Sequence, residues 1–145
     1  MSRRCRGPRV PLSGKVGAMT GTCPFCAPDA ARVIFRDALV TALWDLYPVN
    51  PGHALIVPNR HVAGWEEARV DERAALMAAV DRVRAEIRAR FRADAFNVGF
   101  NDGAAAGQTV FHLHVHVIPR VSGDMEDPRG GVRYVVPGRA RYWEG

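Results

Sequence analysis

Phe111-His112-Leu113-His114-Val115-His116-Val117-Ile118-Pro119 is the stretch of this chain that decides its fold. Histidine recurs at every second position, and the residues between are Leu and Val. This alternation is typical of a β-strand. On a strand, residues i, i+2 and i+4 share one face. We therefore expect a strand over 112–118, with three histidines on one face and the apolar residues turned toward the core.

The three histidines can serve several kinds of chemistry. One metal ion held by all three is disfavoured, since His112 and His116 would lie roughly 13 Å apart along a regular strand and zinc–nitrogen bonds are only about 2.1 Å long. A neutral imidazole can instead act as a nucleophile, and a neighbouring one as a hydrogen-bond donor or acid. The plain alternative is a polar outer face of the sheet.

The rest of the chain mixes strands with helices. Apolar runs bounded by Gly, Pro, Asn or Asp predict strands over 33–35, 40–44, 54–57 and 96–100, the first two forming a hairpin. Apolar residues at helical spacing predict a long helix over 71–92, and 64–68 reads as a short helix. Hairpins without strict βαβ alternation indicate an α+β fold with a largely antiparallel sheet.

The net charge of +5 first suggests a nucleic-acid partner. However, residues 1–18 hold Arg3, Arg4, Arg6, Arg9 and Lys15 and no acidic residue, and removing them leaves 15 basic against 15 acidic residues. We expect 1–21 to form a disordered basic tail, with translation starting either at Met1 or at Met19. The remaining chain has no basic stripe with interleaved aromatics, so a nucleic-acid partner is not favoured.

No membrane span is expected, because the chain lacks an apolar run of the required length. No apolar segment follows the basic N-terminus, so a signal peptide is not indicated either, and the cytoplasm is the expected compartment. Three cysteines, two of them in Cys23-Pro24-Phe25-Cys26, fit a metal site or reduced thiols better than a disulfide framework.

Three motifs together resemble the histidine-triad (HIT) superfamily: Gly107-Gln108-Thr109-Val110 with the histidine stretch, Asn101-Asp102-Gly103, and Pro51-Gly52-His53 with the apolar run to Pro58. The resemblance implies a HIT-like fold over 22–145, in which a five-stranded, largely antiparallel sheet carries one long helix, and a homodimer. The segment from about 121 is expected to be irregular. Part of it, 123–133, is similar to the tail of bacterial diadenosine polyphosphate hydrolases.

The resemblance also assigns catalytic roles. His114 is implied to be the nucleophile that attacks the α-phosphorus of a nucleotide, giving a nucleotidyl-histidine that water hydrolyses. His116 is implied to hydrogen-bond the phosphate or to protonate the leaving atom, and His53 to complete the proton network. For His53, a buried structural histidine is an equal alternative.

Further residues are implied to bind substrate. Asp45 would accept from the ribose hydroxyls, since a diol offers two donors to one carboxylate. The small-residue loop from Asn101, with Gly107, Gln108, Thr109 and Val110, would present backbone and side-chain donors to the phosphate. A plain turn is the alternative for this loop.

Cys-x-x-Cys is a common half of a tetrahedral zinc site. The resemblance supplies the other half, because some bacterial members bind zinc through two further histidines, at the positions of His61 and His112 here. We therefore expect Cys23, Cys26, His61 and His112 to hold a structural zinc, with a metal-free thiol pair as the alternative.

The leading hypothesis is a nucleotide hydrolase that cleaves dinucleoside polyphosphates, such as diadenosine tetraphosphate, at the α-phosphate. The alternative with the same site is a nucleoside phosphoramidase that cleaves a P–N bond. A nucleotide-binding interaction protein with vestigial activity is a third hypothesis, against which the complete triad argues.

Overall fold

The computed structural model describes residues 23–144, so the disordered tail predicted for 1–21 lies outside the described residues. Five antiparallel strands form one sheet, in the order β1-β2-β3-β5-β4. Their bounds are β1 Val33–Arg36, β2 Val40–Trp44, β3 Ala54–Pro58, β4 Ala95–Gly99 and β5 Val115–Arg120. The predicted α+β fold with a five-stranded antiparallel sheet is confirmed.

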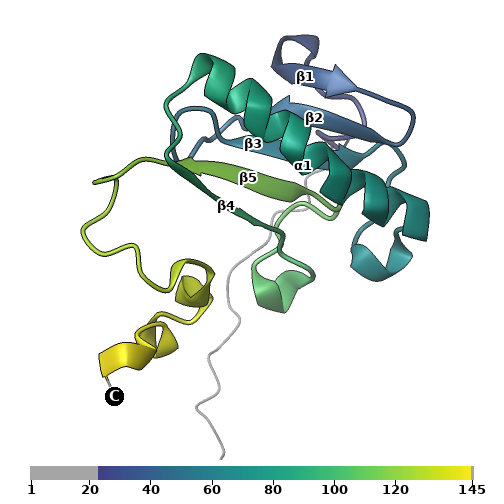
Figure 1. Cartoon of the computed structure of the whole chain (residues 1–145). Coiled ribbons are helices and arrows are strands. Elements are labelled where there is room, and N and C mark those ends of the chain that lie inside the picture. The colour runs from purple at the N-terminus through teal and green to yellow at the C-terminus, as the bar shows by residue number, and fades with distance from the viewer. Residues whose placement is uncertain (1–22, 145) are drawn as a thin grey trace, which may run out of the picture.

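The helix α1, Val70–Arg90, lies across one face of this sheet (Figure 1). Its residues Leu76, Val83 and Ile87 are fully buried against Val115 and Val117 of β5, so the helical spacing in the sequence identified the core face correctly. A second, smaller apolar cluster joins Phe25, Leu43, Leu55 and Val57. Since Leu55 is paired with His116 in the β3–β5 register, the histidine and this second cluster belong to the same side of the sheet.

The strand predicted over 112–118 is shorter at its start than expected. β5 begins only at Val115, where its pairing with β3 stops at Ile56 although β3 continues to Pro58, and β4 already ends at Gly99, opposite His116. The backbone N–H of Leu113 donates instead to the Val62 carbonyl oxygen, at 2.7 Å. His112 and His114 therefore lie in the segment that leads into β5.

The helices also differ slightly from the sequence-based bounds. α1 begins one residue earlier than predicted and ends two residues earlier, because Phe91 leaves the helix in an extended conformation and packs its ring 5.5 Å from that of Trp44. The short helix predicted over 64–68 is a 3-10 turn, Trp65–Glu67. Gly52 has φ +90°, and a Cβ there would lie 2.8 Å from the Phe91 ring, so this position before His53 requires glycine.

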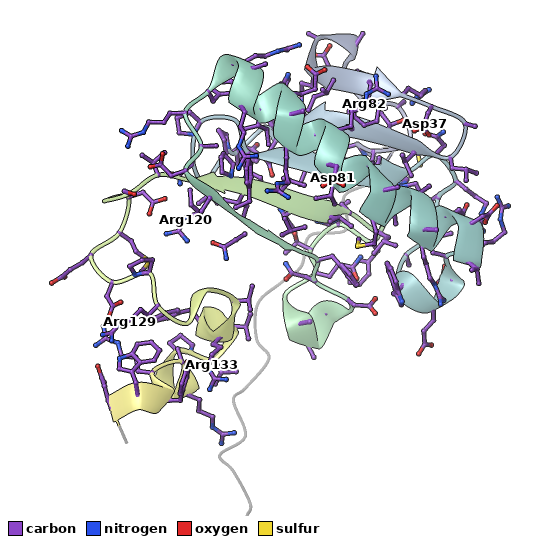
Figure 2. The ribbon with its side chains drawn as sticks, viewed as in Figure 1. Asp37, Asp81, Arg82, Arg120, Arg129 and Arg133 are labelled. Atoms are coloured by element: carbon purple, nitrogen blue, oxygen red, sulfur yellow. The ribbon has the colours of Figure 1, made fainter. Side chains whose placement is uncertain are left out.

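The C-terminal segment after β5 was expected to be irregular, but it contains three short 3-10 turns: Gly131–Val135, Pro137–Arg139 and Tyr142–Glu144. Arg120, at the end of β5, lies between the sheet and this segment, while Arg129 and Arg133 lie within it (Figure 2). Arg133 donates to the carbonyl oxygens of Arg139 and Ala140, and the Arg129 guanidinium lies 4.5 Å from the Trp143 ring. Within residues 23–144, no helix has the length and apolarity needed to cross a membrane.

Candidate active site and metal centre

His114 is held in one tautomer by its own backbone neighbourhood. Its Nδ1 lies 2.8 Å from the carbonyl oxygen of His112. Since a carbonyl oxygen only accepts, Nδ1 carries the proton and Nε2 of the neutral ring keeps a lone pair. The ring is largely buried and lies 5.0 Å from that of Phe25. This arrangement leaves one nucleophilic nitrogen without the need to remove a proton first.

His53 and His116 form a directed hydrogen-bond chain beside it. The backbone N–H of Val49 donates to Nδ1 of His53 at 3.1 Å, so the His53 proton resides on Nε2. That Nε2 lies 2.9 Å from Nδ1 of His116 and donates to it. The proton of a neutral His116 is then on Nε2. The chain Val49, His53, His116 therefore ends in an N–H donor next to His114, whose ring centroid is 5.0 Å from that of His116.

Burial favours the neutral form of both of these histidines. Burial lowers the pKa of His53, partly offset by the nearby carboxylate of Asp45. Burial, followed by the neighbouring His114 and His53 rings, lowers the pKa of His116 to about 4. The neutral forms are those that the hydrogen-bond chain requires, so the electrostatics and the geometry agree.

Asp45 follows the end of β2 and lies within reach of the same chain. One carboxylate oxygen, Oδ1, accepts from the Tyr47 N–H at 2.8 Å, which fixes the side chain. The other, Oδ2, lies 3.4 Å from Nε2 of His53. The residue predicted from the sequence as a ribose ligand is therefore placed where it also contacts the histidine chain.

Gln108 stabilises the loop over 101–109, which precedes His112, through hydrogen bonds of its side chain. Its buried amide donates to the carbonyl oxygens of Ala63 and Val110, at 2.7 and 3.1 Å, and accepts from the Gly103 N–H at 2.8 Å. This side chain was expected to offer a donor to the phosphate, but its two N–H groups are already used within the protein. In this structure Gln108 shapes the loop, and the contact with substrate stays a prediction.

The other predicted loop residues are less enclosed. Thr109 and Gly107 are exposed, and Gly107 has φ +91°, a conformation that suits glycine. Val110 packs against the second apolar cluster. Asn101 is half-buried and lines a cavity next to the histidines. Thr109 and Gly107 are thus accessible to a ligand, and the binding of substrate by this loop stays a prediction.

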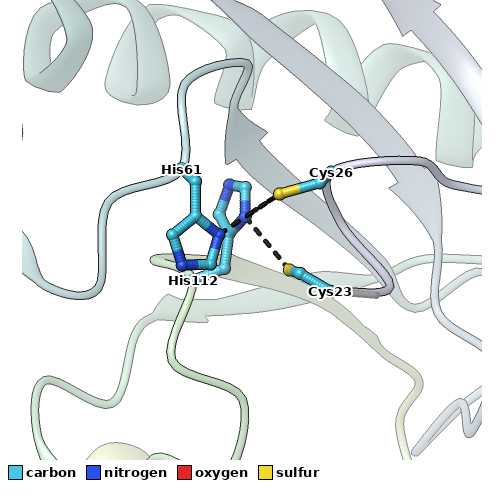
Figure 3. A group of neighbouring side chains, drawn as sticks. All are labelled: Cys23, Cys26, His61 and His112. Atoms are coloured by element: carbon cyan, nitrogen blue, oxygen red, sulfur yellow. Dashed lines mark hydrogen bonds between the residues drawn. The ribbon is translucent and has the colours of Figure 1, made fainter. Parts of the chain in front are cut away.

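A second group of side chains, two cysteines and two histidines, comes together near the start of β5 (Figure 3). Sγ of Cys23 lies 3.4 Å from Nδ1 of His112, and Sγ of Cys26 lies 3.2 Å from Nδ1 of His61 and 3.6 Å from that of His112. All four ligand atoms lie within 4.8 Å of one another. Neighbouring ligands of a tetrahedral zinc ion are roughly 3.4 to 3.8 Å apart. The four residues predicted from the sequence therefore form a group that fits a metal ion.

Outer contacts orient this group. Nε2 of His112 donates to the Pro58 carbonyl oxygen at 2.9 Å, so its Nδ1 lone pair faces the cysteines. Partial desolvation and the neighbouring Cys23 raise the pKa of the Cys26 thiol and so favour its neutral form, whereas a bound cation would favour the thiolate.

The loop that carries His61 is anchored by an ion pair between the exposed side chain of Arg60 and a buried carboxylate. Arg60 makes two hydrogen bonds, at 2.9 and 3.0 Å, to the fully buried carboxylate of Glu72 in the first turn of α1. These bonds lower the pKa of Glu72 to about 2. Sequence reasoning missed Glu72. Two signals were usable: Glu72 lies in the first turn of a long helix, and an arginine directly precedes His61.

A cavity of about 740 Å³ opens beside the histidine chain. His53 and His116 contribute to its wall, together with residues of β4, β5 and the C-terminal segment. Asn50, Arg120 and Asp124 also line it, and no sequence pattern had singled them out. They connect elements that are distant in sequence: Asn50 donates to Asp124 at 2.8 Å and to the Pro119 carbonyl oxygen at 3.0 Å.

Comparison with known proteins agrees with this geometry. Residues 28–123 match the family model described as HIT domain. The chain is 39% identical over 100 residues to the asymmetrical bis(5'-nucleosyl)-tetraphosphatase of Schizosaccharomyces pombe, covering 69% of this chain and 55% of that protein. It is 42% identical over 102 residues to the AP-4-A phosphorylase of Mycobacterium tuberculosis, covering 70% of this chain and 52% of that protein. The chain thus spans about half the length of these curated relatives.

Among solved structures, a Zn-bound histidine triad family protein from Mycobacterium smegmatis superimposes with a TM-score of 0.66 at 34% identity, covering 73% of this chain and 80% of that one. The family-model match extends over well more than half of the sequence and includes the histidine chain, the loop before it and the strand that follows. The chain therefore belongs to the HIT domain family.

Proposed function

We propose that this protein is a nucleotide hydrolase that cleaves at the α-phosphate through a nucleotidyl-histidine, with dinucleoside polyphosphates as the leading substrates. The observation that carries the proposal is the fixed tautomer of His114, whose Nδ1 donates to the His112 carbonyl oxygen at 2.8 Å and whose Nε2 keeps a lone pair. The relatives named as a tetraphosphatase and as an AP-4-A phosphorylase support the substrate class.

In the first step, Nε2 of His114 attacks the α-phosphorus and an N–P bond forms. The bond from phosphorus to the leaving group breaks, and the leaving atom takes its electron pair. A polyphosphate departs as an anion, whereas an amine takes up one proton from solvent. The Nε2–H of His116 donates a hydrogen bond to the charge that develops at the phosphate or leaving atom, which is the usual largest contribution to such catalysis.

In the second step, water attacks the phosphorus of the nucleotidyl-histidine. The N–P bond breaks and its electron pair returns to Nε2 of His114, while one proton of the water is released to solvent. The neutral imidazole is then restored with its proton still on Nδ1. Because the step is divided in two, each barrier is lower than that of a direct displacement by water.

We also propose that Cys23, Cys26, His61 and His112 hold a structural zinc ion. Zinc there would tie the N-terminal loop and the His61 loop to the segment that leads into β5. The ion would have no role in bond breaking, because His112 is its only ligand from the triad and uses Nδ1, whereas His114 acts through its own Nε2. The pairing of this chain as a homodimer is a further proposal, supported by the position of β4 at the edge of the sheet, where one side of its backbone has no strand partner among residues 23–144.

The decisive experiment replaces His114 by Ala. We expect the rate of hydrolysis of diadenosine tetraphosphate to fall by at least about 10³-fold, because no other group can form the covalent adduct. Binding of AMP should change by less than about tenfold, since ribose and phosphate contacts remain. Chromatography of the products and calorimetric titration with AMP measure the two effects. Turnover near the wild-type rate in this variant would contradict the mechanism.

A further inference from the structure

The loop between β2 and β3 has few apolar contacts to hold it in place. Leu46, Tyr47 and Val49 remain 58%, 82% and 68% exposed, and no residue from 46 to 51 is buried. This loop nevertheless supplies the Val49 N–H that holds the tautomer of His53, at 3.1 Å. A segment with so little buried apolar surface depends on its hydrogen bonds for a fixed position.

Asn50 provides side-chain hydrogen bonds that connect this loop to the sheet. Its Nδ2 donates to the Pro119 carbonyl oxygen in β5 at 3.0 Å and to Oδ2 of Asp124 at 2.8 Å. Both amide hydrogens therefore have an acceptor. The backbone carbonyl oxygen of Asn50 accepts from the His53 N–H at 3.0 Å. One residue thus joins β5, through its side chain, to the histidine chain, through its backbone.

Asp124 is itself a fixed acceptor. Arg120, at the end of β5, donates to both of its carboxylate oxygens at 2.7 Å, and the Val121 N–H donates to Oδ2 at 3.1 Å. These donors hold the pKa of Asp124 below its usual range, which favours the anion that accepts from Asn50. Arg120 in turn donates to the Asn97 side chain in β4 at 2.7 Å. The acceptor of Asn50 is therefore anchored to two strands.

We propose that Asn50 is a positioning residue for the hydrolysis, because it keeps the Val49 N–H on Nδ1 of His53. This inference rests on the proposed function, since Asn50 acts only through the histidine chain. With Nδ1 occupied, His53 carries its proton on Nε2 and donates to Nδ1 of His116. His116 then offers its Nε2–H to the phosphate. Without the Val49 contact, both rings can take the opposite tautomer, in which Nε2 of His116 has no hydrogen to donate.

The first test measures kcat and KM for diadenosine tetraphosphate with Asn50→Ala. We expect kcat to fall about tenfold and KM to change by less than about threefold, because the His116 donor acts on charge that develops in the transition state. Asn50→Asp, which is equal in size, should lower kcat at least as much, since it sets a carboxylate against that of Asp124. This second variant separates the loss of the amide hydrogen bonds from a loss of packing.

Asp37→Ala is the matched control. Asp37 also holds a turn between neighbouring strands through two hydrogen bonds, which it accepts from the N–H groups of Leu39 and Val40 at 3.0 Å each. That turn joins β1 to β2 and so lies at the other end of β2 from Asp45. Asp37→Ala should lower the urea midpoint, as Asn50→Ala does, but leave kcat unchanged. An equal loss of kcat in both variants would overturn the inference.

A double-mutant cycle shows whether Asn50 acts through His53. In the His53→Ala background, Asn50→Ala should change kcat by less than about twofold, because no His53 tautomer remains to be controlled. A merely structural role would lower kcat by the same factor in both backgrounds, and that result would also overturn the inference.

The tautomer itself can be measured without catalysis. Heteronuclear NMR of protein labelled in its histidines should show His53 protonated on Nε2 in the wild type and in Asp37→Ala. In Asn50→Ala, the two ring nitrogens of His53 should instead give signals averaged over both tautomers. The wild-type pattern in Asn50→Ala would contradict the inference. If the wild-type protein does not hydrolyse diadenosine tetraphosphate, the proposed function fails, whereas the NMR comparison still decides whether Asn50 sets the tautomer.

Discussion

His112 and His114 are separated by one residue, yet they face different chemistry. His112 donates from Nε2 to the Pro58 carbonyl oxygen and turns Nδ1 toward two cysteines. His114 donates from Nδ1 to the His112 carbonyl oxygen and keeps Nε2 free. The same side chain thus presents opposite ring nitrogens, and the difference is set by which backbone oxygen each ring meets.

The comparison teaches that the spacing of the histidines does not decide their roles. The metal group is assembled by loops: the Cys23–Cys26 turn, the segment after β3 and the segment before β5. The catalytic group, by contrast, depends on the sheet, because His116 belongs to β5 and His53 directly precedes β3. One group can therefore be disturbed with limited effect on the chemistry of the other, and this independence is open to test.

The largest effect that tests this independence is expected from removal of the metal ligands. Cys23→Ser with Cys26→Ser should abolish binding of about one zinc per chain and lower the melting temperature by on the order of 10 °C, since structural zinc contributes folding free energy. Elemental analysis of protein purified without chelator, and calorimetric melting with and without chelator, measure both. Activity at a temperature where the variant is folded should fall less than in His114→Ala.

The control for this prediction is Cys5→Ser, which removes a thiol outside the four-residue group. It should retain the zinc content and melting temperature of the wild type. The prediction is contradicted if the wild-type protein contains no zinc and the double variant has the same melting temperature. The cysteines would then not be metal ligands, and His112 would not belong to a metal site separate from the catalytic group.

The fold was largely predictable because local pattern and tertiary packing agree along most of the chain. The apolar spacing of Leu76, Val83 and Ile87 in α1 matches the buried face. The start of β5 was not predictable, because alternation continues through His112 and Leu113, whereas β4 ends opposite His116 and the Leu113 N–H donates to Val62 instead of to β3. A strand needs neighbouring strands to pair with, and its own sequence does not indicate where that pairing stops.

The site residues that belong to recognisable motifs could be predicted from the sequence. Hydrogen bonds between residues that are distant in sequence could not. The metal group and His53 beside His116 came together as expected. Nothing in the sequence around Gln108 indicated that its side-chain amide would donate to the carbonyl oxygens of Ala63 and Val110. The contacts of Asp124 with Arg120 and Asn50 join segments far apart in the chain, and a single sequence gives no signal for such pairs.

A smaller effect is expected for Asp45. The family resemblance implies that it binds the ribose, and the structure shows that it also contacts His53. Asp45→Ala should raise KM about tenfold and lower kcat less, because contacts to the ribose are similar in the ground and transition states. Asp81→Ala, at a side chain 91% exposed on α1, is the matched control. A loss confined to kcat would instead assign Asp45, 3.4 Å from Nε2 of His53, to the orientation of the histidine chain.

The smallest effect concerns pH and separates His116 from His112. The pKa of His116 is lowered to about 4 by burial and by its histidine neighbours, against about 6.5 in an unfolded chain. Between these values the unfolded chain binds more protons, so the free energy of unfolding should fall as the pH falls from about 6.5 toward 4, with no contribution from this group above 6.5.

His116→Gln keeps an acceptor for His53 but cannot titrate, so its urea midpoint should fall less between pH 7 and pH 5 than that of the wild type. The burial-lowered pKa of His112 is common to both proteins, which makes the difference between the two slopes specific to the catalytic group. Parallel slopes would mean that His116 is not desolvated by the fold, and the neutral hydrogen-bond chain would lose its electrostatic basis.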